Sequence, residues 1–156
     1  MTTIESVIAL DPFTVRRTVR FGDCDPAGVV YTVRFSDYVV SAMDLFLSAL
    51  LGGPYLARLG DVQTPLKALQ FVFRAPLRPD DMFDMIVSVR AIRRRTFDLA
   101  IAAQLPDGSP IFDATVTPMC VTVGGERRSV AIPEPLRSLL QHHHREEPSH
   151  AATLSD

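Results

Sequence analysis

The residues best suited to chemistry stand together in residues 21–31, FGDCDPAGVVY. Two carboxylates, Asp23 and Asp25, flank Cys24 and precede a Pro-Ala-Gly break. Aspartate is common in turns and helix caps, so a structural loop is one interpretation. The other is a reactive carboxylate, because the N–H groups and positive dipole at the start of a following helix would polarise a substrate carbonyl there. The pattern by itself leaves both interpretations open.

A helix is predicted directly after this loop, over residues 32–51. Its polar side chains recur three or four positions apart and form one narrow stripe, while nearly all other positions are apolar. A helix that is apolar over most of its circumference must be enclosed by the rest of the protein. Gly52-Gly53-Pro54 is expected to end it.

Most of the remaining chain alternates apolar and polar residues with period two, which is typical of strands. Strands are predicted at 13–21, 66–75, 83–93, 96–105 and 110–123. Pro118 indicates a bulge or an edge in the last strand, and residues 130–141 indicate a short helix. Tight turns such as Asp107-Gly108 favour an antiparallel sheet. The expected class is α+β, with a long antiparallel sheet around one helix and exposed edges that another copy of the chain can meet.

Length and composition indicate a single globular domain. The chain has 156 residues, of which 47% are hydrophobic, and a net charge of −2. Residues 1–11 are expected to be a loose N-terminal lead-in, 12–141 the domain and 142–156 a disordered polar tail. The charge gives no general attraction to nucleic acid or to an anionic membrane, and two cysteines make no disulfide framework. We expect a cytoplasmic protein without a signal peptide or a membrane span.

The opening stretch resembles the signature of the 4-hydroxybenzoyl-CoA thioesterase family in the hotdog-fold superfamily. The likeness is to the branch whose catalytic acid directly precedes Pro-Ala-Gly, and FGDCDPAG carries it. Weaker matches follow in the same order, at Thr64-Pro65, 93–97, Gly125-Glu126-Arg127 and Ile132-Pro133. The resemblance covers residues 13–135 and implies a hotdog fold, in which a long antiparallel sheet wraps around one central helix. It also implies a homodimer or homotetramer with the active site at the subunit interface.

The mechanism that the resemblance implies is thioester hydrolysis. Asp25 would attack the carbonyl carbon or activate a water that attacks it. Backbone N–H groups near Tyr31 and Thr32 would polarise the carbonyl oxygen, and Thr64 would reach in from the partner subunit. A thiolate leaves readily, because free thiols have a pKa of about 8.5, so no histidine is required. All four histidines stand at 142–144 and 150, which disfavours Ser-His-Asp chemistry.

The same resemblance implies that Arg93, Arg94, Arg95, Thr96 and the weaker candidate Arg128 bind the phosphates of CoA. A solvated strand end is the alternative interpretation of the arginine run. Strand alternation sends Arg94 to the opposite side from Arg93 and Arg95, so not all three can serve one ligand. Nucleic-acid binding is disfavoured, because no aromatic side chains are interleaved with the run.

Three other residues of the opening segment have a structural interpretation. Asp23 is expected to fix the loop, and Cys24 to be a small packing residue. Tyr31 is either a packing residue at the helix start or a wall of the acyl pocket. Thr32 and Val40 depart from the family pattern, which leaves the acyl group open.

The implied function is an acyl-CoA thioesterase that hydrolyses an aromatic, 4-hydroxybenzoyl-like or short-chain acyl-CoA without a metal or a cofactor. A thioesterase for acyl-carrier-protein thioesters remains an alternative within the same class. An acyl-CoA-binding hotdog protein without turnover remains an alternative from a different class.

Overall fold

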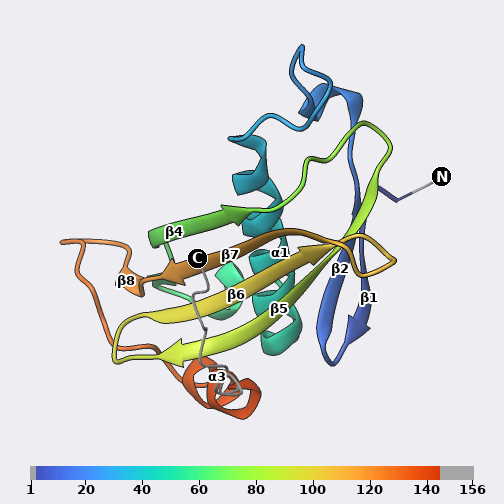
Figure 1. Cartoon of the computed structure of the whole chain (residues 1–156). Helices are drawn as coiled ribbons and strands as arrows, with labels where there is room; N and C mark the ends of the chain where they lie inside the picture. The colour runs from blue at the N-terminus through green and yellow to red at the C-terminus, as the bar shows by residue number, and fades with distance from the viewer. Residues whose placement is uncertain (1–2, 145–156) are drawn as a thin grey trace, which may run out of the picture.

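Six strands form one antiparallel sheet in the computed structural model, which describes residues 3–144 (Figure 1). Their bounds are β1 Glu5–Leu10, β2 Phe13–Thr18, β4 Leu66–Phe73, β5 Met82–Ile92, β6 Phe97–Gln104 and β7 Pro110–Pro118. The spatial order is β1-β2-β5-β6-β7-β4, and every neighbouring pair is antiparallel. One long helix, α1 (Arg34–Leu51), packs across this sheet. The α+β hotdog arrangement predicted from the sequence is therefore confirmed.

Helix α1 lies within the predicted range and buries one broad face. The buried residues recur three or four positions apart, as a helical face requires: Phe35, Tyr38, Val39, Ala42, Met43, Phe46 and Leu47. The helix ends at Gly52, whose φ of 72° is a left-handed conformation that glycine adopts without a steric penalty.

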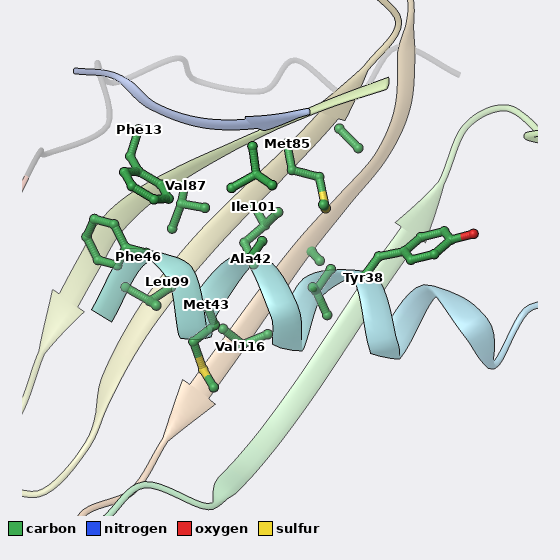
Figure 2. Packing of buried hydrophobic residues seen from close by; sticks show 14 of the residues in the cluster. Phe13, Tyr38, Ala42, Met43, Phe46, Met85, Val87, Leu99, Ile101 and Val116 are labelled. Atoms are coloured by element: carbon green, nitrogen blue, oxygen red, sulfur yellow. The ribbon is translucent and has the colours of Figure 1, made fainter. Parts of the chain in front are cut away.

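The inner face of the sheet supplies the other half of the core. Val87 stands opposite Ile101 in the β5–β6 register, and all four side chains of the pairs Val87–Ile101 and Val89–Leu99 are buried. Figure 2 shows Val87, Leu99 and Ile101 gathered over Ala42 and Phe46 of α1. The alternation predicted for these two strands is therefore present, and it places their apolar residues against the helix.

The N-terminal segment corrects the sequence prediction, because residues 5–10 form strand β1 and not a loose lead-in. Glu5 pairs with Arg17 and Val7 with Val15 of β2, which extends the sheet by one strand. Ile8 and Leu10 are exposed, so β1 shows no alternation between a buried and an exposed face. The period-two signal that marks a half-buried strand is therefore missing from its sequence.

The C-terminal part differs from the prediction in two places. The single strand predicted over 110–123 is divided after Pro118, which lacks the N–H that a continuing ladder needs. Beyond it, β8 (Val121–Thr122) pairs with β3 (Val62–Gln63) in a separate two-stranded sheet. Helix α3 (Leu136–His143) includes the first two residues of the predicted polar tail, and residues 145–156 lie outside the described part of the chain.

The two sheet edges differ in what they expose. Strand β4 pairs with β7 along one side only, and its other side is an edge of the sheet. Leu69, Val72 and Phe73 of β4 are all exposed. Strand β1 forms the opposite edge. Among the described helices, none combines the length and the apolar character that crossing a membrane requires.

Candidate active site

The loop that contains Asp25 is a tight turn that orients its carboxylate. The Ala27 N–H donates to Asp25 Oδ1 at 2.8 Å, and the Gly28 N–H donates to the Asp25 carbonyl at 2.9 Å. Gly28 has a φ of +79°, which explains a glycine at this position. Within residues 3–144, Asp25 Oδ2 accepts no hydrogen bond. The half-buried carboxylate therefore has one oxygen held by the backbone and one available for chemistry.

The Asp23 side chain links the same loop to helix α1 and to the backbone before the loop. Its buried carboxylate accepts a hydrogen bond from the Tyr38 hydroxyl at 2.8 Å and one from the Arg20 N–H at 3.2 Å. The guanidinium of Arg34 lies 3.7 Å from its other oxygen. Burial and the bond to Asp23 raise the pKa of Tyr38, so this hydroxyl remains a donor. These contacts agree with the structural interpretation of Asp23.

The start of α1 supplies free N–H groups, although one predicted donor is wrong. The Tyr31 N–H is taken by the Asp23 carbonyl at 2.9 Å, so it cannot polarise a substrate. The N–H groups of residues 34–36 donate back to the carbonyls of 31–33. Within the described chain, the N–H groups of Thr32 and Val33 have no acceptor. The N–H groups left available at the helix start are thus those of Thr32 and of Val33, which the sequence analysis did not single out.

The start of α1 lacks a side-chain cap, which lowers helix stability and leaves backbone N–H groups free. Val33 occupies the N-cap position and provides no hydrogen-bonding side chain. An N-cap without a Ser, Thr, Asp or Asn side chain costs about 1 kcal/mol of helix stability. It also leaves the backbone donors available to a ligand.

Aromatic side chains border the loop on the side of β4. The rings of Phe35 at the start of α1 and Phe73 at the end of β4 have centroids 5.0 Å apart, and Phe73 stacks on Phe71 at 5.2 Å. Tyr31 and Val33 are exposed. The Tyr31 ring is therefore not packed into the core, and it lies at the apolar rim of the loop.

Thr64 lies far from Asp25 within one chain. It lies two residues before the start of β4, whose far end at Phe73 contacts Phe35 at the start of α1. Eight strand residues span about 25 Å at 3.3 Å per residue. Within residues 3–144, the Thr64 hydroxyl is buried and has no hydrogen-bond partner. The role of this hydroxyl in the site of a partner subunit stays a prediction.

The predicted CoA-binding arginines lie at the turn between β5 and β6, and they differ in availability. Arg93 makes a two-pronged ion pair with Asp98 at 2.8 and 2.9 Å, and this contact lowers the pKa of Asp98. Arg128 pairs with Glu126 at 2.9 Å. Both guanidinium groups are thus already bound to a carboxylate.

The other members of this group have no such competitor. Arg94 and Arg95 are exposed and have no carboxylate partner within residues 3–144, and Arg95 contacts Ser129 at 3.3 Å. Thr96 is only 8% exposed, so it presents little surface to a phosphate. The arginines most available to an anion are therefore Arg94 and Arg95.

The predicted site residues fall into two groups at opposite ends of the sheet. Residues 21–33, which contain Asp25, Tyr31 and Thr32, lead into the start of α1 at the top of the view in Figure 1, and the β5–β6 turn lies at the lower left. The Arg95 carbonyl accepts from the Cys120 N–H, and the Pro65 carbonyl accepts from the Met119 N–H, so the arginines are neighbours of Thr64. One chain does not bring the two groups together.

A half-buried carboxylate on α1 was missed in the sequence analysis. Burial raises the pKa of Asp44, and its side chain interacts with the phenol of Tyr55. Together with Ser41 and Ser48 they line a cavity of about 280 Å³. Asp44 belongs to the polar stripe of the helix, which was the only sequence signal for it. Within residues 3–144, no three His, Cys, Asp or Glu side chains are grouped as metal ligands.

Solved structures of thioesterases and of hypothetical proteins share this fold. A hypothetical protein from Thermus thermophilus is 25% identical, with a TM-score of 0.75 over 84% of this chain and 98% of that chain. The 1,4-dihydroxy-2-naphthoyl-CoA thioesterase from Synechocystis is 23% identical, with a TM-score of 0.73 over 83% and 95%. The 4-hydroxybenzoyl-CoA thioesterase from Pseudomonas sp. strain CBS-3 is 21% identical, with a TM-score of 0.71 over 81% and 96%. A search of curated proteins found no match.

A match of the sequence to a family model identifies the family of this chain. The model of the thioesterase-like superfamily matches residues 19–140, which include the Asp25 loop, α1 and all strands from β3 onward. This match covers well over half of the chain. The chain therefore belongs to the thioesterase-like superfamily.

Proposed function

We propose that the protein is an acyl-CoA thioesterase with Asp25 as its catalytic carboxylate, acting on an aromatic or short-chain acyl group. The observation that carries the proposal is the turn at Asp25. Its Oδ1 is held by the Ala27 N–H, and its free Oδ2 stands in the loop that leads to the unpaired N–H groups of Thr32 and Val33. A carboxylate and two donors at one helix start are the groups that acyl transfer needs.

The chemistry follows from these groups. The thioester oxygen accepts hydrogen bonds from the N–H groups of Thr32 and Val33, which stabilise the negative charge that develops on it. Asp25 Oδ2 removes a proton from a water that attacks the carbonyl carbon, or itself attacks to form an anhydride that water then hydrolyses. The carbon–sulfur bond breaks, and the thiolate leaves without needing a strong general acid. The products are a carboxylic acid and a thiol.

A second copy of the chain would complete the site. We propose that the open edge of β4 pairs with the same edge of a partner about a two-fold axis, giving a dimer or a tetramer of such dimers. Antiparallel pairing places the beginning of one β4 beside the end of the other. Arg94 and Arg95 of one copy would then lie on the side of Asp25 of its partner.

The first test is thiol release from benzoyl-, 4-hydroxybenzoyl-, phenylacetyl- and aliphatic acyl-CoA esters, with the native chain and with Asp25→Asn. We expect the native chain to reach a kcat/KM of about 10⁴ M⁻¹s⁻¹ or more on one class. Asp25→Asn should lower kcat by about 10³-fold or more, while affinity for a non-hydrolysable thioether analogue remains. Unchanged turnover in Asp25→Asn would contradict the site. Binding without turnover in the native chain would identify an acyl-CoA-binding protein instead.

One observation favours a second candidate, a thioesterase for acyl carrier proteins. Arg93 and Arg128, two of the cations predicted to bind CoA, are engaged by Asp98 and Glu126. A carrier-protein thioester has the pantetheine arm but no adenosine phosphates, so it needs fewer arginines here. Comparing an acyl-CoA, the matching acyl-pantetheine and the matching carrier-protein thioester separates the candidates. A much higher kcat/KM on the carrier protein alone would favour the second.

A further inference from the structure

We propose that Tyr38 and Asp23 are positioning residues for thioester hydrolysis, and that Glu5 of β1 supports them. This inference rests on the proposed function, because it concerns how the helix start and the Asp25 loop are held in place for the reaction. Neither side chain touches the carboxylate that does the chemistry. Each acts through the backbone of the loop.

The first contact joins the helix to the loop. Tyr38 lies one turn into α1, its ring is fully buried, and its hydroxyl donates to Asp23 Oδ2 at 2.8 Å. A buried phenol costs free energy unless its hydroxyl has a partner, and a phenylalanine would fill the same space without that cost. The hydroxyl therefore serves the loop and is not needed to fill the core.

The second contact, between the Tyr31 N–H and the Asp23 carbonyl, links the held Asp23 to the free N–H groups at the start of α1. The carbonyl of Asp23 accepts the Tyr31 N–H at 2.9 Å, one residue before the unpaired N–H of Thr32. Asp25 follows Asp23 by two residues, and Cys24 and Val30 form an isolated bridge between the two sides of the loop. Holding Asp23 thus fixes both the reactive carboxylate and the N–H groups of Thr32 and Val33.

The third set of contacts comes from β1 and β2. The Arg17 guanidinium lies 4.6 Å from the centroid of the Tyr38 ring, where its charge interacts favourably with the aromatic face. Glu5 accepts hydrogen bonds from Arg17 and from Ser41, which is on the next turn of α1. Glu5 lies on β1, so this support comes from the N-terminal edge strand.

The test uses Tyr38→Phe, which removes one oxygen and leaves the ring in place. We expect the Tyr31 amide to exchange with deuterium at least about tenfold faster. We expect kcat to fall about tenfold, with KM changed less than twofold, because the geometry for the transition state is lost and the binding surface is retained. The matched control is Thr14→Val, which removes a buried hydroxyl near the start of β2 that donates to the carbonyl of Pro12. It should leave both readouts unchanged.

Substitutions of Asp23 separate positioning from general stability. Asp23→Asn keeps an acceptor for Tyr38, so it should retain most of the kcat and the slow exchange of the Tyr31 amide. Asp23→Ala removes the acceptor, so it should reproduce the losses seen in Tyr38→Phe. Equal losses in Asp23→Asn and Asp23→Ala would overturn the inference.

Failure of the inference and failure of the proposed function give different results. Unchanged amide exchange in Tyr38→Phe overturns positioning, whatever the enzyme hydrolyses. A kcat loss that equals the loss of folded protein also overturns it, because it shows a role in stability only. If the native chain cleaves no thioester, the proposed function fails, and faster exchange at Tyr31 would still support the holding of the loop.

Discussion

At the scale of single residues, the arginines at 93–95 differ in whether their guanidinium groups are available to bind a phosphate. Arg93 is bound by both oxygens of Asp98, which also accepts a hydrogen bond from the Thr117 hydroxyl. A phosphate would have to displace this carboxylate, whereas the Arg95 guanidinium contacts the Ser129 hydroxyl and, within residues 3–144, no carboxylate. Strand alternation separated Arg94 from Arg93 and Arg95, but it could not show that Arg93 is engaged, because Asp98 faces Arg93 only once the hairpin has formed.

This difference predicts unequal effects of two matched substitutions. Arg95→Ala should raise the KM for an acyl-CoA about tenfold, which corresponds to the loss of one phosphate contact of about 1.4 kcal/mol. Arg93→Ala should leave that KM within about twofold. Neither should change the KM for the acyl-pantetheine, which lacks the nucleotide. Steady-state kinetics on the two substrates measures this, and equal KM effects of the two variants would contradict it.

Asp44 gives a prediction about pH. Burial is the main cause that raises its pKa, the hydrogen bond from Tyr55 opposes this, and the charge of Glu5 adds to it. The folded state therefore holds the proton more tightly than the unfolded state, so this group's contribution to stability falls as pH rises through the folded pKa. Asp44→Asn should raise Tm at pH 7, and the gain should disappear below about pH 4, where the acid is neutral in both states. A constant Tm difference across this range would contradict the assignment.

The Asp25 loop shows what residue types predict and what they do not. Gly28 and the Ala27 N–H form the turn that the Pro-Ala-Gly sequence suggested. The loss of Tyr31 as a donor was not predictable, because its N–H is taken by a carbonyl eight residues earlier in the chain. Backbone hydrogen bonds of this kind depend on the conformation of the folded loop, so they cannot be predicted from composition or residue spacing.

At the scale of elements, the sequence predicts a helix or strand best when one face of it is buried and the other is exposed. Helix α1 and strands β5 and β6 have clear periods, because one face of each meets the core. Strand β1 has no such period, since it sits at an edge with exposed apolar residues, and it was interpreted as a lead-in. Pro118 indicated a bulge or an edge but not the division of the strand, and the pairing of β8 with β3 is a long-range contact that local pattern does not encode.

The edge strand β1 gives a prediction at this scale. A chain that begins at Asp11 lacks Glu5, so the buried ends of Arg17 and Ser41 lose their partner. We expect Tm to fall by several degrees or more, because the β1–β2 ladder is lost together with a partly buried charge contact worth about 1–3 kcal/mol. We also expect a lower kcat, because Arg17 packs on Tyr38.

The control is a chain that begins at Thr3, which keeps β1 complete and should match the full chain in both measurements. Calorimetry and thiol release provide the two readouts. A chain starting at Asp11 with unchanged Tm and kcat would show that β1 contributes nothing to the helix start.

At the scale of the whole molecule, the separation of the two groups of site residues predicts that subunits complement one another. Asp25→Asn chains should be inactive, and Arg95→Ala chains should have a raised KM. When the two are unfolded and refolded together, mixed pairs should contain one site with a native Asp25 from one chain and a native Arg95 from the other. A component with the native KM should therefore appear in the mixture.

The alternative arrangement gives a different result in the same experiment. If each site used Asp25 and Arg95 of one chain, no pair in the mixture would hold both native residues in one site. The native KM would then be absent at every mixing ratio. Separate refolding of each variant, followed by mixing without exchange, is the control.

The two groups of residues at opposite ends of β4 also have a consequence for how activity depends on concentration. In the proposed dimer, an isolated chain would hold one half of each of two sites and no complete site. Specific activity should therefore be constant while the paired form dominates, and should fall on dilution once the chains separate. In that range the rate should grow with nearly the square of the total chain concentration, so the catalytic unit counted in an assay would be the pair and not the polypeptide.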